Sequence, residues 1–376
     1  MKEGWEYKTL GECCDVNYGT RVVRSKVSGS EFPVYGGGGE TFRINCYNRE
    51  NCLVVARFAM SKQCTRYVNG KFFLNDSGLT VSPKKDSCLT KELLEKYLLA
   101  NNDLIYSFGR GSAQRNLNMS EFRSMLISFP IDNNEQRRIV SYLDSSFKLI
   151  DEIKNKALKS LTEAKALFQS ALAEATEPKE GWEEKTLKEI GLTQTGTTPS
   201  KSNKAYYGNY IPFIRPSEIN IDGLGTIEYN SEIMLSQKGI EAGRKFTKKS
   251  ILMVCIGATI GKVGYSERDI SCNQQINVLS PYNGYNYKYL YYAMSSSVFQ
   301  KKVIKEGTSA QATLPIINKG KWGKLSLYIP PLSTQKRIVS HLDKLSSKVR
   351  AIEEKYQKIV EECDALKQAM LRDVFE

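Results

Sequence analysis

The sequence is poor in residues that usually hold metals or perform acid–base chemistry. Its 376 residues include one histidine, His341, and an internal repeat places Tyr142 at the equivalent position. Because the repeat accepts tyrosine there, we expect no catalytic or metal-binding role for this histidine. The nine cysteines form no Cys-x-x-Cys pair, and Cys13 and Cys14 are adjacent, which is too close for a zinc site. We expect reduced, packed thiols and no metal.

Long apolar runs are also missing. No stretch approaches the ~20 apolar residues that cross a membrane. The segment Met1–Trp5 lacks the apolar core of a signal peptide. The sequence therefore predicts a cytoplasmic protein without membrane contact.

Signatures of catalysis are incomplete. Gly257–Lys262 is similar to a phosphate-binding loop, but Ile256 replaces its first glycine and Val263 its final Ser or Thr. The glycine-rich segment Tyr35–Gly39 lacks the strand and helix of a dinucleotide site, and indicates a turn near a ligand or a nucleic-acid backbone. Glu152–Lys154 ends like a nuclease signature but falls within a predicted helix. We expect no catalytic residue in the chain.

Positive charge is what the sequence has in excess. Lysine and arginine number 54 against 41 aspartates and glutamates, a formal net charge of +13. Such an excess favours an anionic partner, and nucleic acid first. A solubilising surface charge is the alternative interpretation.

The chain repeats itself at about half its length. Glu3–Trp5 with Lys8–Leu10 returns as Glu180–Trp182 with Lys185–Leu187, and most of Gln136–Asp144 returns 199 positions later. The repeat predicts an internal two-fold in the order globular segment, helix, globular segment, helix. The expected boundaries are 1–132, 133–176, 177–332 and 333–376.

Apolar residues in both helical segments recur at alternating steps of three and four, which predicts a coiled-coil seam. The seam residues are Ile139, Leu143, Ile150, Ile153 and Leu167 in the first segment, and Ile338, Leu342, Leu345, Val349, Ile352, Tyr356, Ile359, Leu366 and Met370 in the second. The first segment has Ala or Ser at its other seam positions, so its small seam fits the bulky seam of the second.

A two-fold relation requires the two helices to run antiparallel. The seam covers about 32 residues, or roughly 48 Å. The two chain termini should then be neighbours. Two unrelated amphipathic helices, each lying on its own domain, are the alternative.

The globular segments indicate a mixed fold. Short apolar runs predict strands at Leu53–Ala56, Leu104–Tyr106 and Ile251–Val254. Helices are expected at Thr90–Leu99, with Thr90 as the N-cap, and at Tyr287–Val303. The predicted fold class is α+β: two pseudo-symmetric mixed α/β domains joined by an antiparallel coiled coil.

Basic and aromatic residues interleave in the predicted loops. Arg and Lys suit phosphates and guanine edges, whereas Gln and Asn suit adenine edges. The candidate DNA contacts are Arg21, Arg24, Lys26, Tyr35, Gly37, Arg57, Lys62, Arg66, Arg110, Gln114 and Arg115 in the first half, and Lys201, Lys204, Tyr206, Arg215, Ser217, Arg244, Lys245, Thr259, Lys262, Gln274, Ser309 and Gln311 in the second. Each one alone could be surface decoration. The repeated Ser-Ala-Gln at 112–114 and 309–311 could equally be a structural turn.

Together these residues resemble the specificity subunit of type I restriction–modification systems. The resemblance covers the whole chain and rests on the doubled openings and helix starts. It also rests on Phe32–Gly36, Asp76–Gly78, Gly196–Ser200, Ile211–Pro216, Gly257–Lys262 and Asn273–Gln275.

The resemblance implies that each globular half is a target recognition domain reading one half of an asymmetric, split site in double-stranded DNA. It implies that the helices set the gap and dock two modification subunits, which hold S-adenosylmethionine. Restriction subunits using ATP and Mg²⁺ would join them, and this chain would supply no cofactor and no catalysis. A non-catalytic coiled-coil scaffold whose heads bind proteins is the alternative.

Overall fold

The computed structural model describes residues 2–112, 114–219, 225, 227, 229, 233–308 and 315–375. Contacts divide the chain into two compact units, Met1–Ala157 with Lys358–Glu376 and Leu158–Gln357. Each unit contains one globular head and part of both long helices. The first head is residues 2–132 and the second head is residues 177–331.

The first head is built mainly of strands. Its strands are β1 (Trp5–Thr9), β2 (Cys14–Tyr18), β3 (Phe32–Gly36), β4 (Gly39–Ile44), β5 (Arg49–Ala56), β6 (Thr65–Leu74), β7 (Gly78–Pro83), β8 (Gly109–Arg110), β9 (Asn116–Leu117) and β10 (Leu126–Pro130). Its helices are α1 (Leu10–Cys13), the 3₁₀ turn η1 (Arg24–Lys26), α2 (Lys91–Ala100), α3 (Asn102–Ser107) and α4 (Met119–Arg123).

The second head has a similar order of elements. Its strands are β11 (Glu183–Thr186), β12 (Gly191–Thr195), β13 (Tyr207–Gly208), β14 (Ile211–Ile214), β15 (Met234–Leu235), β16 (Ile251–Val254), β17 (Val263–Tyr265), β18 (Ser271–Cys272), β19 (Ile276–Pro281) and β20 (Ser326–Ile329). Its helices are α6 (Leu187–Ile190), η2 (Lys204–Tyr206), η3 (Pro216–Glu218), α7 (Gln237–Ala242), α8 (Tyr287–Ser295), α9 (Ser297–Thr308) and α10 (Lys319–Trp322).

Both heads share one topological frame. The strand order β2-β7-β5-β6 of the first head has its counterpart in β12-β19-β16-β17 of the second. Each head also pairs its first strand with its last, β1 with β10 and β11 with β20. The heads differ outside this frame. In the first, β3 adds in parallel to β6, whereas β13, β15, β14 and β18 form a separate sheet in the second.

The repeated Lys-Thr-Leu opening begins the short helix that follows the first strand of each head. The Thr9 amide donates to Glu12 Oε2 at 2.6 Å, and the Thr186 amide donates to Glu189 Oε2 at 2.8 Å. These are capping boxes, which satisfy amides at a helix start. The leucine that follows each threonine is fully buried.

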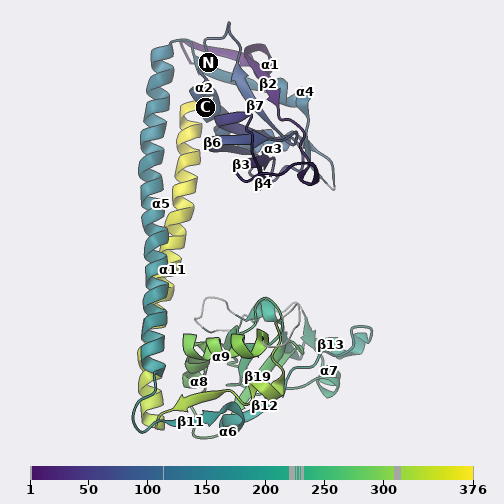
Figure 1. Ribbon diagram of the computed structural model, residues 1–376, viewed down its shortest axis with the longest axis vertical. Coiled ribbons are helices and arrows are strands. Elements are labelled where there is room, and N and C mark those ends of the chain that lie inside the picture. Colours follow the sequence, from purple (N-terminus) through teal and green to yellow (C-terminus); the bar gives the residue numbers. More distant parts are fainter. Residues whose placement is uncertain are drawn as a thin grey trace. The chain divides into compact units, whose positions relative to one another are not determined.

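Two long helices connect the heads, α5 (Asn133–Thr176) and α11 (Leu332–Phe375), each of 44 residues. Within the first unit, the start of α5 pairs with the end of α11, and Lys154 lies 2.6 Å from Asp364. Within the second unit, the end of α5 pairs with the start of α11, and Lys165 lies 3.0 Å from Glu353. The pair is therefore antiparallel, as the repeat predicts, and both helices can be followed in Figure 1.

The predicted seam is correct in register at most positions. Ile139, Leu143, Ile150, Leu342 and Val349 are buried. The others that are at least half-buried are Ile338, Leu345, Tyr356, Ile359 and Met370.

The seam prediction is wrong at four positions. Ile153, Leu167, Ile352 and Leu366 are 52%, 63%, 36% and 51% exposed. The ends of both helices also pack in the cores of the heads, so which side chains are buried there does not follow the seam alone. Their neighbours, such as Phe168 on α5, turn inward instead.

A buried glutamine attaches each long helix to its head. Gln136 Oε1 accepts hydrogen bonds from the amide and hydroxyl of Thr90, both at 2.8 Å, and Nε2 donates to the Cys88 and Pro130 carbonyls. Gln335 accepts from the Asn286 amide at 2.8 Å and donates to the Pro330 carbonyl at 2.9 Å. The repeated helix start is thus an anchor.

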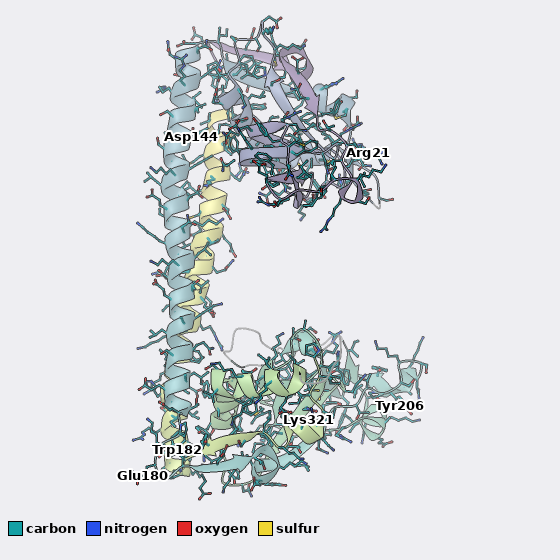
Figure 2. The ribbon with its side chains drawn as sticks, in the orientation of Figure 1. Arg21, Asp144, Glu180, Trp182, Tyr206 and Lys321 are labelled. Atoms are coloured by element: carbon teal, nitrogen blue, oxygen red, sulfur yellow. The ribbon has the colours of Figure 1, made fainter. Side chains whose placement is uncertain are left out.

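The aspartate that ends the repeated motif makes a second attachment. Asp144 on α5 pairs with Lys96 of α2, and Figure 2 places Asp144 where α5 faces the first head. Asp343 on α11 pairs with Lys288 of α8 at 3.0 Å and accepts a hydrogen bond from the Tyr292 hydroxyl at 2.7 Å. Glutamine and aspartate therefore hold the same head helix at two points.

The chain termini lie together, which confirms the expectation from the two-fold. Lys2 Nζ donates to the Val374 carbonyl at 3.0 Å, and the Phe375 ring lies 5.0 Å from that of Tyr97. Both ends appear beside the first head in Figure 1.

Some local predictions were wrong. Leu104–Tyr106 lies in helix α3 because a short apolar run does not distinguish strand from helix. The helix expected at Tyr287–Val303 is two helices, α8 and α9, divided at the buried Ser296 in extended backbone. Thr90 is the N-cap of α2 as predicted, but its hydroxyl donates to Gln136 instead of capping. Leu53–Ala56 and Ile251–Val254 are strands as predicted.

Among the described residues, no helix combines the length and the apolar character that crossing a bilayer requires.

The anchor gives a testable prediction. Replacing Gln136 by alanine should lower the free energy of unfolding by about 2 kcal/mol, because the buried groups around Thr90 and Cys88 lose their partner. Urea denaturation followed by circular dichroism measures the change. Arg138→Ala is the control, since Arg138 is largely exposed and pairs with Glu135 of its own helix, and it should change the free energy of unfolding much less than the Gln136 substitution. Equal effects of the two substitutions would contradict the anchor.

Candidate nucleic-acid interface

Five loops of the first head meet at one edge of its main sheet: residues 19–31, 37–38, 57–64 and 75–77, and the described residues of 111–115. The Gly37 amide donates to Ser77 Oγ at 3.1 Å, and the Thr20 amide donates to the Leu74 carbonyl at 2.9 Å. The Leu117 amide donates to the Arg57 carbonyl at 2.8 Å, and the Met60 amide to the Arg115 carbonyl at 2.9 Å. These contacts bring most of the predicted first-half residues to one place, which we name the first loop edge.

Two arginines at the first loop edge lie against aromatic rings. The Arg57 guanidinium is 4.7 Å from the Tyr18 ring centre and 4.5 Å from that of Phe58. The Arg115 guanidinium is 4.5 Å from the Tyr106 ring centre and donates to the Gly109 carbonyl at 3.0 Å. Stacking holds a guanidinium plane in one orientation while its charge remains, which suits recognition of phosphates and base edges.

Other predicted residues of this edge are occupied by contacts within the head. Arg66 donates to the Gly37 carbonyl at 2.8 Å, and a side chain at the buried Gly37 would lie 2.7 Å from the Phe58 carbonyl. The Tyr35 ring packs edge-on against Phe72, with centres 5.5 Å apart. Contacts within the head thus hold Arg66, Gly37 and Tyr35 in place around this turn.

Arg110 is exposed but neutralised. Its guanidinium makes two hydrogen bonds to the Glu121 carboxylate, at 2.6 and 2.7 Å. A nucleic-acid contact by Arg110 would therefore compete with this pair.

The remaining residues predicted for the first loop edge are exposed: Arg21, Arg24, Lys26, Lys62 and Gln114. Figure 2 shows Arg21 at the outer side of the first head.

A second set of loops meets in the second head: residues 196–206, 215–219, 255–262 and 273–275. The Thr197 amide donates to the Cys272 carbonyl at 2.9 Å, and the Asn273 amide donates to the Ile214 carbonyl at 3.1 Å. Lys262 Nζ donates to the Pro216 carbonyl at 3.3 Å. We name this surface the second loop edge.

Several cations at or next to the second loop edge already have partners. Arg215 pairs with Glu218, with Nε 2.8 Å from Oε1, and Arg244 donates to the Thr195 carbonyl at 2.6 Å. Lys245 lies 2.8 Å from Asp269, whose hydrogen bond raises the pKa of the lysine. Partial burial lowers the pKa of Lys262.

The exposed predicted residues of this edge are Lys201, Lys204, Ser217, Thr259 and Gln274, and Tyr206 is half-buried. Gln274 accepts a hydrogen bond from the Thr198 hydroxyl. Tyr206 lies on an outlying part of the head in Figure 2. Ser309 and Gln311 lie outside the described residues.

Within the part of the chain that the structure describes, no group of three or more His, Cys, Asp or Glu side chains is placed to hold a metal ion. His341 is exposed on α11. Cys14 Sγ lies 3.8 Å from Cys13 Sγ in the core of the first head.

Sequence reasoning missed the partners that modulate these cations. Tyr18 is 40% exposed and stacks with Arg57, while Glu121 and Asp269 neutralise Arg110 and Lys245. The partners lie from 11 to 39 positions away in the chain, so no local pattern indicated them.

The chain has clear relatives among known proteins. A family model described as the type I restriction modification DNA specificity domain matches residues 2–163 and 179–361. The type I restriction enzyme HindI specificity subunit of Haemophilus influenzae is 31% identical over 179 residues, 44% of this chain and 37% of the relative. The type I restriction enzyme MjaIX specificity subunit of Methanocaldococcus jannaschii is 27% identical over 43% of this chain and 37% of the relative. The chain thus spans little more than a third of the length of these two relatives.

A longer match and a solved structure extend the likeness. A putative type I restriction enzyme specificity subunit of Haemophilus influenzae is 24% identical over 93% of this chain and 89% of the relative. One chain in a structure of a type I R-M system has a TM-score of 0.73 and 19% identity, covering 100% of this chain and 98% of that one. The two chains share a fold.

Lys201 and Lys245 differ in whether a carboxylate already pairs with them, so we expect their substitution to affect DNA binding differently. Lys201 is exposed and forms no ion pair with any carboxylate of the described residues, whereas Lys245 is paired with Asp269. Lys201→Ala should lower the slope of log affinity against log salt by about 1, because one phosphate contact releases one counterion. Lys245→Ala should change it less. Fluorescence anisotropy with duplex DNA at several salt concentrations measures both slopes, and the reverse order would contradict the assignment.

Proposed function

Because the chain belongs to the family of type I restriction–modification DNA specificity domains, we propose that it is the DNA-binding specificity subunit of a type I restriction–modification complex. Each head reads one half of a bipartite site, and the paired helices set the gap between the half-sites. The observation that carries this proposal is one repeated frame that presents two different loop edges.

DNA is the partner that the chemistry of the edges favours. The formal net charge is +13, and exposed arginines and lysines lie at the first loop edge and exposed lysines at the second. Arg21, Arg24 and Lys26 follow one another on a single loop, where they suit successive phosphates. The stacked Arg57 suits a bidentate contact to a base edge.

The difference between the edges supports an asymmetric site. The first edge combines stacked arginines with a glycine-rich turn, while the second has lysines, hydroxyls and the amide of Gln274. Two readers with different donor and acceptor groups select different base sequences.

The long helices are the proposed docking surface for two modification subunits. Leu149, Ile153 and Leu167 of α5 are more than half exposed, and Leu366 of α11 is also exposed. Exposed apolar side chains on a charged helix suit a protein partner. The modification subunits would hold S-adenosylmethionine, and restriction subunits would use ATP and Mg²⁺. This chain contributes recognition and no catalysis.

A matched insertion tests the role of the helices. One heptad is added to α5 after Ala157 and one to α11 after Val360, so that the Lys154–Asp364 and Lys165–Glu353 pairs both survive. Seven helical residues add about 10 Å, or roughly three base pairs. The methylated site should keep both half-site sequences and gain about three base pairs in its gap. Methylation-aware genome sequencing reads the site.

The same heptad inserted in α5 alone keeps the phase of the seam and should also change the gap, with both half-site sequences unchanged. Altered half-site sequences with an unchanged gap in the matched variant would contradict the proposal.

A further inference from the structure

Two ion pairs between the long helices are related by the internal repeat. Lys154 lies 2.6 Å from Asp364 in the first unit, and Lys165 lies 3.0 Å from Glu353 in the second. The shift of 199 positions that relates the two helix starts carries Lys154 onto Glu353 and Lys165 onto Asp364. The two pairs are therefore one contact repeated by the two-fold, but its charges are not symmetric. Lysine stands on α5 both times, and a carboxylate stands on α11 both times.

We propose that this asymmetry is a partner code, by which the face of α5 accepts an α11 helix and rejects a second copy of α5. In the same antiparallel arrangement, two α5 helices would bring Lys154 of each copy against Lys165 of the other. Two α11 helices would bring Glu353 against Asp364, also twice. Charges beside a coiled-coil seam select partners in this way, through repulsion in the wrong pair as well as attraction in the right one.

Partial burial of one charge in each pair strengthens the electrostatic discrimination between partners. The Glu353 side chain is only 16% exposed, and Lys154 is 27% exposed, whereas Lys165 and Asp364 are more open. One partly buried charge in each pair is screened less by water and salt than a fully exposed one. The repulsion between Glu353 or Lys154 and a like charge placed against it would therefore be stronger than at an open surface.

Side-chain size supports the same choice of partner. The seam of α5 contains Ala157, Ser160 and Ala164, each buried or half-buried, whereas that of α11 contains Tyr356 and Ile359. Two α5 helices would pair small residues with small ones and leave cavities in the seam, and two α11 helices would pair large residues with large ones and overpack it. Pairing α5 with α11 avoids both.

A further ion pair between the long helices carries no such code. Asp151 lies 2.6 Å from Lys367, but the repeat carries these positions onto Arg350 and Phe168, which are not two opposite charges. The part of the discrimination that comes from charge therefore depends on the two related pairs. Its consequence is that each half of the chain selects the opposite half, so an assembly with two identical heads is disfavoured. This inference rests on the helix pair and does not depend on DNA binding.

A double charge exchange removes the code while it preserves the fold. In the variant Lys154→Glu with Asp364→Lys, the α5–α11 pair keeps two opposite-charge contacts. However, a pair of two α5 helices would now bring Glu against Lys165 twice, and a pair of two α11 helices would bring Lys against Glu353 twice. The variant should therefore unfold at the temperature of the parent and lose the part of its discrimination that comes from charge.

The experiment begins with the folded full chain. A protease site is inserted in the connector 177–182, and the chain is cut after folding. Isotope-labelled and unlabelled cut proteins are mixed under conditions in which label exchange shows that the halves separate and pair again. Native mass spectrometry then counts pairs of unlike and like halves. The parent should give almost only unlike pairs, and the double variant should lower the ratio of unlike to like pairs by about tenfold.

The control exchanges two charges within α5, Lys159→Glu with Glu163→Lys. This pair is exposed and lies within one helix, so its reversal should leave the pairing as in the parent. The proposal is overturned if the parent distributes statistically into like and unlike pairs. It is also overturned if the double variant, with label exchange complete, remains as selective as the parent.

Discussion

The attachment of each long helix to its head is the constraint on which the rest of the structure depends. Gln136 and Gln335 are almost fully buried and bind main-chain groups of their heads at the first turns of α5 and α11. A buried amide without partners would be costly, so the helix start has one acceptable position on the head. Asp144 and Asp343 then fix the next turns through a lysine of the head helix. The repeated motif at the helix starts, Gln136–Asp144 and Gln335–Asp343, thus supplies the side chains that make this attachment.

The repeat therefore separates what must stay constant from what is free to vary. The capping boxes, the strand pairs β1–β10 and β11–β20, and the glutamine anchors occur in both heads, and each has a mechanical role. The loop edges carry none of these roles, and the first has stacked arginines whereas the second has lysines, hydroxyls and an amide. A protein with this division can change what it recognises without changing how its parts are joined.

Much of the frame was predictable from the sequence, because helix periodicity and an internal repeat are properties of local order. The antiparallel helices, most of their seam and the neighbouring termini follow from the positions of residues such as Leu143 and Leu342. The loop edges were less predictable, because their contacts come from distant parts of the chain. Arg110 appears available in the sequence, yet Glu121 neutralises it, and Arg66 holds the Gly37 carbonyl. Leu104–Tyr106, predicted as a strand, lies in helix α3 directly after α2, where Ile105 is fully buried.

The central claim is that two unlike heads read two unlike half-sites at a fixed separation. The most direct measurement is the complete DNA methylation pattern of a strain with the gene and of the same strain without it. The account predicts one asymmetric, bipartite motif with an unspecified gap of constant length, methylated in the first strain and unmethylated in the second. An unchanged methylation pattern, or the loss of a continuous palindromic motif instead, would contradict it.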